Sequence, residues 1–200
     1  MLRLILVPLL LLATPTVAAQ LTCDGPFAAD SSEARLVESF GRDNVVTGDI
    51  PGPEGSIILA TTVFPNDPEK QMEFGWWDEA GLTQLAYFTV PANDMAPQGV
   101  KAGMTVKEVE ALNEGPFDLQ GFWWDYGGYA NFTGGRLGAP EQGCLVSVRF
   151  APTADYPQDL NVDAISGEMT VPSTEPLLEE VDARVESVSV SYPDFGATED

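Results

Sequence analysis

Histidine is absent from this 200-residue sequence, and lysine and arginine together number only 9 against 31 aspartates and glutamates, which gives a net charge of −22. Without an imidazole, the chain lacks the usual catalytic base, a common metal ligand and the physiological pH switch. So few cations also cannot form the basic surface that displaces counterions from nucleic acid. We therefore expect no nucleic-acid partner and no cofactor.

Long apolar runs are missing outside the N-terminus. Residues 1–19 hold one cation, Arg3, then an apolar stretch and a small-residue end, a pattern typical of a secretory signal peptide that is cut before Gln20. The apolar stretch is shorter than the ~20 residues that a membrane span requires. We expect a bacterial protein that is periplasmic or secreted and has no membrane span.

Cysteine occurs only twice, as Cys23 and Cys144, which are 121 positions apart. The oxidising compartment that exported chains enter favours a bond between them, and two free buried thiols are the alternative. Closing a loop of this length constrains the unfolded chain by about 5 kcal/mol in an ideal-chain treatment. The bond would leave no thiolate for catalysis or for a zinc cluster.

The remaining composition, 44% hydrophobic and 10% aromatic, is that of a folded domain. In residues 20–95, an acidic start and an apolar face predict a helix at 30–40. Runs rich in β-branched and aromatic residues then predict strands at 56–64, 71–78 and 83–90. We interpret this segment as a helix plus β-meander module.

The same order of elements repeats in residues 96–150. Thr105 and Glu108 have the spacing of a capping box at the start of a second helix. Three candidate strands follow, at 119–124, 129–133 and 144–150. This segment is interpreted as a second helix plus β-meander module.

The last segment, residues 151–200, holds 12 acids and one cation. Its pattern predicts an acidic loop, a short helix, a final strand at 188–192 and a frayed tail. The fold class expected for the whole chain is α+β, with antiparallel sheets and short helices on one face. Two tandem helix-plus-meander modules would provide such an arrangement.

A family resemblance lies in residues 103–112, Gly-Met-Thr-Val-Lys-Glu-Val-Glu-Ala-Leu, followed by Gly115 and Pro116. This helix signature resembles that of the small periplasmic modules related to the BamE/SmpA outer-membrane assembly lipoprotein and to the β-lactamase inhibitory protein. The resemblance implies helices packed on one face of an antiparallel sheet and a binding role without catalytic residues. The chain departs from the assembly factor in lacking its lipidated cysteine. Beyond this segment, the chain resembles uncharacterised bacterial secreted proteins.

All four tryptophans occur in two doublets, Trp76-Trp77 and Trp123-Trp124, each followed by an aspartate. Neighbouring residues on a strand point to opposite faces of a sheet. If both doublets lie on strands, Trp76 and Trp124 face the core while Trp77 and Trp123 face away. The alternative is that both sheet faces are covered and all four rings are packed. The candidate binding residues are Trp77, Asp78, Trp123, Asp125 and Tyr126.

The leading interpretation is a non-enzymatic exported protein that binds another envelope or secreted protein through these aromatic residues. A second interpretation is glycan binding at the Trp-Asp segments. Glycan hydrolysis would require Asp78 and Asp125 about 5 to 9 Å apart. It is less favoured, because among 31 acidic residues such pairs arise by chance. A third is that the acidity serves only to keep the protein soluble.

A partial calcium-loop pattern lies in the acidic segment. Asp159, Asn161 and Asp163 have the spacing of the first three calcium ligands. Ala164 stands where such a loop needs glycine, and Thr170 where it needs a bidentate glutamate. We therefore favour a solvated acidic loop over a metal site.

We expect salts of any kind to stabilise the protein and calcium to add little beyond them. The reason is that screening over about 8 Å relieves the repulsion within so acidic a chain. Thermal unfolding in sodium chloride and calcium chloride at matched ionic strength tests this expectation. A large rise of Tm in submillimolar calcium, absent with sodium, would instead place a cation at Asp159, Asn161 and Asp163.

Overall fold

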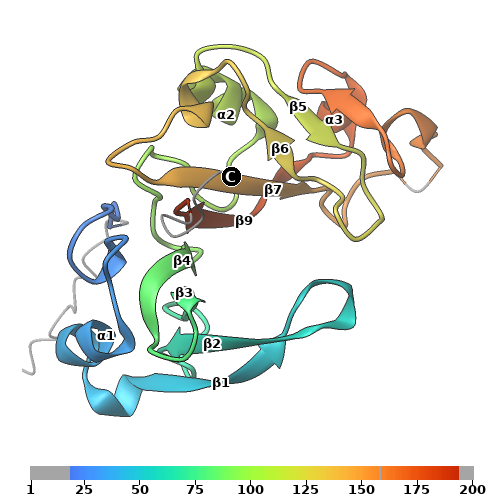
Figure 1. Cartoon of the computed structure of the whole chain (residues 1–200). Helices are drawn as coiled ribbons and strands as arrows, with labels where there is room; N and C mark the ends of the chain where they lie inside the picture. The colour runs from blue at the N-terminus through green and yellow to red at the C-terminus, as the bar shows by residue number, and fades with distance from the viewer. Residues whose placement is uncertain (1–18, 158, 194–200) are drawn as a thin grey trace, which may run out of the picture.

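The computed structural model describes residues 19–157 and 159–193 (Figure 1). This part of the chain folds into two antiparallel sheets with short helices, which confirms the expected α+β class. The α-helices are α1 (Glu33–Phe40), α2 (Val106–Asn113) and α3 (Leu177–Glu180). The strands are β1 (Val45–Pro51), β2 (Ile57–Val63), β3 (Met72–Asp78), β4 (Thr83–Thr89), β5 (Asp118–Gln120), β6 (Ala130–Asn131), β7 (Leu145–Ala151), β8 (Thr170–Pro172) and β9 (Arg184–Ser191). Short 3-10 helices are η1 (Gly25–Phe27), η2 (Arg42–Asn44), η3 (Pro53–Gly55), η4 (Arg136–Gly138) and η5 (Asp163–Ile165).

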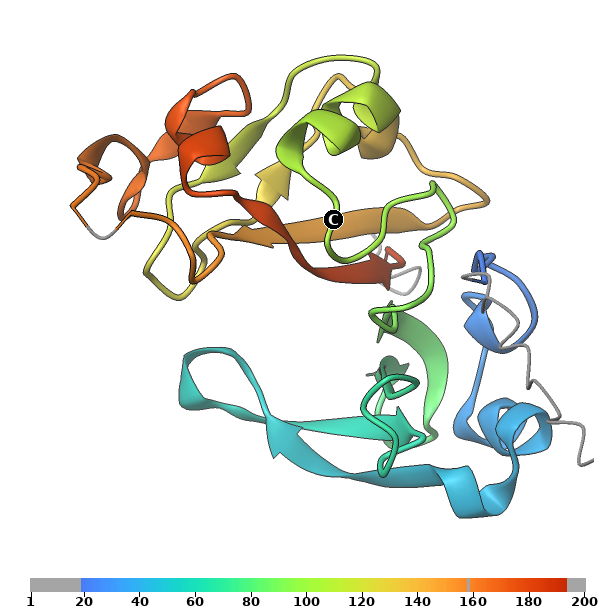
Figure 2. The same ribbon diagram turned by 180° about the vertical axis from the view of Figure 1, so that it is seen from behind.

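The larger sheet joins distant parts of the sequence. Its strand order is β1-β2-β3-β4-β9-β7, so that the late strand β9 lies between β4 and β7. A smaller sheet has the order β6-β5-β8. Residues 20–95 supply β1 to β4 and residues 96–150 supply β7 to the larger sheet, while β5 and β6 lie in the smaller sheet. Residues 151–200 supply β9 to the larger sheet and β8 to the smaller one. In Figures 1 and 2, the larger sheet curls, with the β1–β2 hairpin at one end and β7 at the other.

Local hydrogen bonds explain where the two longer helices begin. Ser32 caps α1, because its side chain accepts a hydrogen bond from the backbone N–H of Arg35. Thr105 and Glu108 form the predicted capping box of α2. Gly41 then ends α1 with a positive φ of 86°, a conformation that favours glycine.

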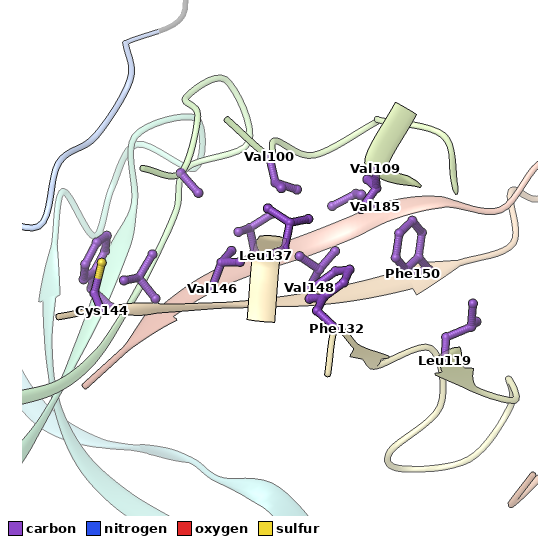
Figure 3. Close-up of a cluster of buried hydrophobic side chains, with 14 of the residues drawn as sticks. Val100, Val109, Leu119, Phe132, Leu137, Cys144, Val146, Val148, Phe150 and Val185 are labelled. Carbon is purple, nitrogen blue, oxygen red and sulfur yellow. The ribbon is translucent and has the colours of Figure 1, made fainter. Parts of the chain in front are cut away.

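One face of the larger sheet is buried against the helices and the smaller sheet. Near α1, the ring of Phe27 lies 6.0 Å from that of Phe74 and 4.9 Å from that of Phe88. Figure 3 shows the continuation of this core, where Val109 of α2 lies beside Val185 of β9 and Leu119 of β5 lies toward the Phe150 end of β7. A single apolar core therefore runs along the sheet from β3 to β7.

The opposite face of the sheet is polar over β7 and β9. Its register pairs Ser147 with Ser189 and Arg149 with Ser187, so these four side chains share one face. All four are exposed or half-buried, unlike the buried Val146 and Val148.

The structure joins Cys23 and Cys144 in a disulfide, the pair that the sequence predicts. Their Cα atoms are 6.4 Å apart, and Cys144 is fully buried directly before β7. The bond ties the first described residues to the far end of the larger sheet. None of the described helices is long and apolar enough to cross a membrane. The predicted signal peptide, apart from Ala19, and the predicted frayed tail from Asp194 lie outside the described residues.

The strands differ from the expectation in the second half of the chain. The expected strand at 119–124 ends at Gln120, so the Trp123-Trp124 doublet lies in a loop and the predicted alternation fails there. Trp123 adopts a positive φ of 65°, which is incompatible with a strand. The expected strand at 129–133 shortens to β6, and β8 was not expected. In the first half of the chain, β1 was not expected either.

The first doublet does lie on a strand, and its two rings have different environments. Trp76 is 5% exposed, and its indole N–H donates to the hydroxyl of Thr61, whereas Trp77 is 47% exposed. We therefore expect Trp76→Ala to destabilise the protein by about 3 to 5 kcal/mol, the usual cost of emptying a buried aromatic site. Trp77→Ala should cost clearly less. Denaturant unfolding of both variants measures the difference, and equal large losses would contradict this assignment.

Candidate binding site

The 121–129 loop, which connects β5 to β6, is held at both ends by backbone hydrogen bonds. At its start, Phe122 donates to Ile165 O and accepts from the N–H of Gly167. At its end, the N–H of Gly128 donates to Gln120 O at 2.9 Å, which closes the loop. The loop is therefore fixed against both the smaller sheet and the acidic segment.

Gly128 fastens the same loop to the larger sheet. Its carbonyl accepts the N–H of Phe150 at 2.8 Å, and a Cβ at this glycine would meet Phe150 O at 1.9 Å. The positive φ of 80° at Gly128 also favours glycine. Only a residue without a side chain permits this close approach, which brings the aromatic residues of the loop beside β7.

An aromatic pocket forms between this loop, β7 and the tip of the β1–β2 hairpin. Its volume is about 510 Å³. The residues that line this aromatic pocket are Glu54, Trp124, Asp125, Tyr126, Tyr129 and Arg149. The rings of Trp124 and Tyr126 lie 5.5 Å apart and cross at 64°, so they form a corner rather than a flat platform.

Hydrogen bonds fix the polar ends of both rings. The indole N–H of Trp124 donates to Gly121 O at 2.8 Å, within the loop itself. The phenol of Tyr126 donates to Glu54 Oε1 at 2.8 Å, and so links the loop to the hairpin tip. This bond to a carboxylate raises the pKa of the Tyr126 phenol above its ordinary value. What remains free to meet a ligand is mainly the ring faces.

Arg149 is the cation of the aromatic pocket, and its contacts are internal. Its Nε donates to Gly127 O at 2.9 Å and lies 3.5 Å from a carboxylate oxygen of Glu186. Its guanidinium carbon lies 5.4 Å from the ring centroid of Tyr129, within the range of a cation–π contact.

Trp123 points away from the aromatic pocket. It is 53% exposed, and its ring lies 5.8 Å from that of Phe122 and 6.4 Å from that of Tyr156. It lines an adjoining hollow of about 230 Å³ that Trp124 and Arg149 also line. The 121–129 loop thus presents aromatic rings to two neighbouring hollows.

The other candidate residues, Trp77 and Asp78, do not line either of these hollows. The indole N–H of Trp77 donates to Tyr192 O at 3.3 Å. Asp78 accepts from the N–H of Gly81 and from the hydroxyl of Thr83 in the β3–β4 turn. These bonds lower the pKa of Asp78, the opposite of what a general acid requires. Its geometry is that of a turn-forming residue.

The weak calcium candidates form part of a turn. The side-chain oxygen of Asn161 accepts from the N–H of Asp163 at 2.9 Å. Across the described ranges, no group of three or more acidic or cysteine side chains is placed to hold a metal ion.

A further hollow, of about 480 Å³, lies between α2 and α3. Its cations are matched by acids, because Lys107 pairs with Glu179 and Arg184 pairs with Asp182. The hydroxyl of Ser173 is also engaged, by Glu110. The remaining acids of this hollow, Glu110 and Glu175, accept hydrogen bonds from the Ser173 hydroxyl and from the N–H of Leu177.

Sequence reasoning identified Asp125 and Tyr126 but missed the other four members of the aromatic pocket. Its assignment of Trp124 to the core is wrong, because Trp124 is half-buried and lines the aromatic pocket. Glu54 comes from the hairpin tip and Arg149 from β7, and only the folded topology brings them to the 121–129 loop, which itself holds Trp124 and Tyr129. Arg149 carried one usable signal, since it is a charged residue within the apolar run of β7. Comparison with protein-family models, curated proteins and solved structures finds no match to this chain.

Asp78→Asn should lower Tm at neutral pH, and the deficit should shrink on acidification. The folded-state pKa of Asp78 lies below its ordinary value, so its contribution is present above pH ~4 and is lost as the pH falls through the lower folded value. Thermal unfolding of this variant and the wild type from pH 7 to pH ~2 tests this. Asp159→Asn, with the same charge change in an exposed loop, is the control. A deficit that grows in acid would exclude the turn role.

Proposed function

We propose that the chain is an exported, non-enzymatic protein that binds another envelope or secreted protein through the 121–129 loop. The observation that carries this proposal is the exposure of three large rings on one fixed loop. Trp123, Tyr126 and Tyr129 are 53%, 45% and 40% exposed. Aromatic side chains are the usual energetic anchors of protein interfaces, and a loop that is already ordered loses little entropy on binding.

The β1–β2 hairpin also exposes a large apolar side chain. Ile57 is 72% exposed and lies three residues after Glu54, which is bonded to Tyr126. The hairpin therefore carries an exposed apolar residue close in sequence to the one that contacts the loop, and apolar residues beside polar ones are usual at an interface.

Two features support export. The disulfide between Cys23 and Cys144 is of the kind that persists in oxidising compartments. The pattern of residues 1–19 predicts a signal peptide. The resemblance of residues 103–112 to periplasmic modules favours a binding role in the same compartment.

Glycan binding is the second candidate, and the volume of the aromatic pocket favours it. A hollow of about 510 Å³ with rings and carboxylates lies in the size range of small-ligand sites. Against it stands the crossed arrangement of Trp124 and Tyr126, which provides no flat stacking surface. The N–H of Trp124 and the O–H of Tyr126 are also already engaged.

Trp123→Ala should weaken capture of a specific envelope or secreted protein about tenfold or more, the effect of removing an interface anchor. Trp77→Ala is the matched control, because it removes an equally exposed tryptophan outside both hollows. Quantitative cross-linking to envelope extract, with the full-length protein and with Tm as a folding check, provides the measurement. Equal capture by both variants, or selective binding to a glycan array that Trp123→Ala abolishes, would contradict the proposal.

A further inference from the structure

The aromatic pocket offers π-faces and acceptors but few donors. The indole N–H of Trp124 already donates to Gly121 O, and the phenol O–H of Tyr126 already donates to Glu54 Oε1. The faces of such rings carry negative electrostatic potential, which attracts a cation placed over them. A ligand that needs donated hydrogen bonds, such as an anion, finds as side-chain donors here mainly Arg149 and the phenol of Tyr129.

The carboxylates of the aromatic pocket are not neutralised by cations of the protein. In the described part of the chain, neither Glu54 nor Asp125 takes part in an ion pair. Arg149 is matched instead by Glu186. With that pair counted as neutral, the aromatic pocket retains two unbalanced negative charges.

The fold itself already places a cation against one of these rings. The guanidinium of Arg149 lies over Tyr129 at 5.4 Å. The neighbouring corner formed by Trp124 and Tyr126 has the same chemistry and two unpaired carboxylates beside it. The whole chain, at −22, adds a long-range field that draws basic partners toward it.

We propose that the aromatic pocket receives the ammonium or guanidinium group of a lysine or arginine side chain that a basic protein partner inserts. This inference rests on the proposed function, because the partner supplies the side chain. The cation lies against the rings of Trp124 and Tyr126, and Asp125 and Glu54 accept its hydrogen bonds.

The test uses short capped peptides that carry one lysine or one arginine, with neutral counterparts that carry norleucine or citrulline. Binding to the ¹⁵N-labelled full-length protein is followed by NMR at the Trp124 indole N–H and at the backbone amides of the 121–129 loop. The cationic peptides should shift these signals and bind several-fold more tightly than their neutral counterparts. Added sodium chloride should weaken the binding, because both carboxylates are exposed.

Variants locate the contact. Asp125→Asn and Glu54→Gln should each weaken binding of the cationic peptides about twofold to fivefold, the range of an exposed ion pair. Asp159→Asn makes the same change in net charge outside the aromatic pocket and should leave their binding unchanged. An equal loss in Asp159→Asn would show that only the overall field acts, and would overturn the inference.

Other outcomes also decide the question. Equal binding of citrulline and arginine peptides, or no shift at the Trp124 indole with any peptide, would overturn the cation site. Shifts with tetramethylammonium but not with the peptides would assign the aromatic pocket to a free organic cation and refute the side-chain proposal. If Trp123→Ala abolishes partner capture while Asp125→Asn changes nothing, the binding function stands and this inference alone fails.

Discussion

The pairing of β9 with β4 on one side and β7 on the other is the constraint on which the rest of the structure depends. Tyr87 of β4 and Leu145 of β7 both lie opposite Ser191 of β9, which makes the larger sheet continuous. This continuity gives the two parts of the chain a common core. It also sets Arg149 opposite Ser187, beside the carboxylate that neutralises it.

Most cations of the protein are engaged in ion pairs with its acids. Nine cations are available, and outside Arg3 all but Lys101 form an ion pair with an acid in the described part of the chain. Exposed pairs of this kind each contribute little to stability. Their larger effect is that nearly all of the few Lys and Arg side chains are already paired, so most of the surplus carboxylates have no cation of the protein left to pair with. An acidic surface of this kind repels other acidic macromolecules and leaves basic partners as the favoured class.

Features with a local cause could be predicted from the sequence. The capping box of α2 depends on Thr105 and Glu108 alone, and the alternation in β3 depends on a pattern within seven residues. The 121–129 loop has a non-local cause, because Gly128 must lie against Phe150 for the chain to turn there. Residues 119–124 therefore have the composition of a strand, but the strand ends at Gln120 because the chain turns into the loop there. Likewise, β1 contains Gly48, Asp49 and Pro51, which are poor strand formers, and it forms because β2 pairs with it along its whole length.

The same pairing pattern explains why the bond between Tyr126 and Glu54 matters for the aromatic pocket. β3 pairs with β2 only from Ala60 onward, so the outer half of the β1–β2 hairpin is a two-stranded ribbon. Such a ribbon is marginally stable by itself. Beyond the sheet, the bond from Tyr126 to Glu54 links its tip to the 121–129 loop. A cation that takes hydrogen bonds from Glu54 therefore meets a carboxylate that already joins the hairpin tip to the 121–129 loop.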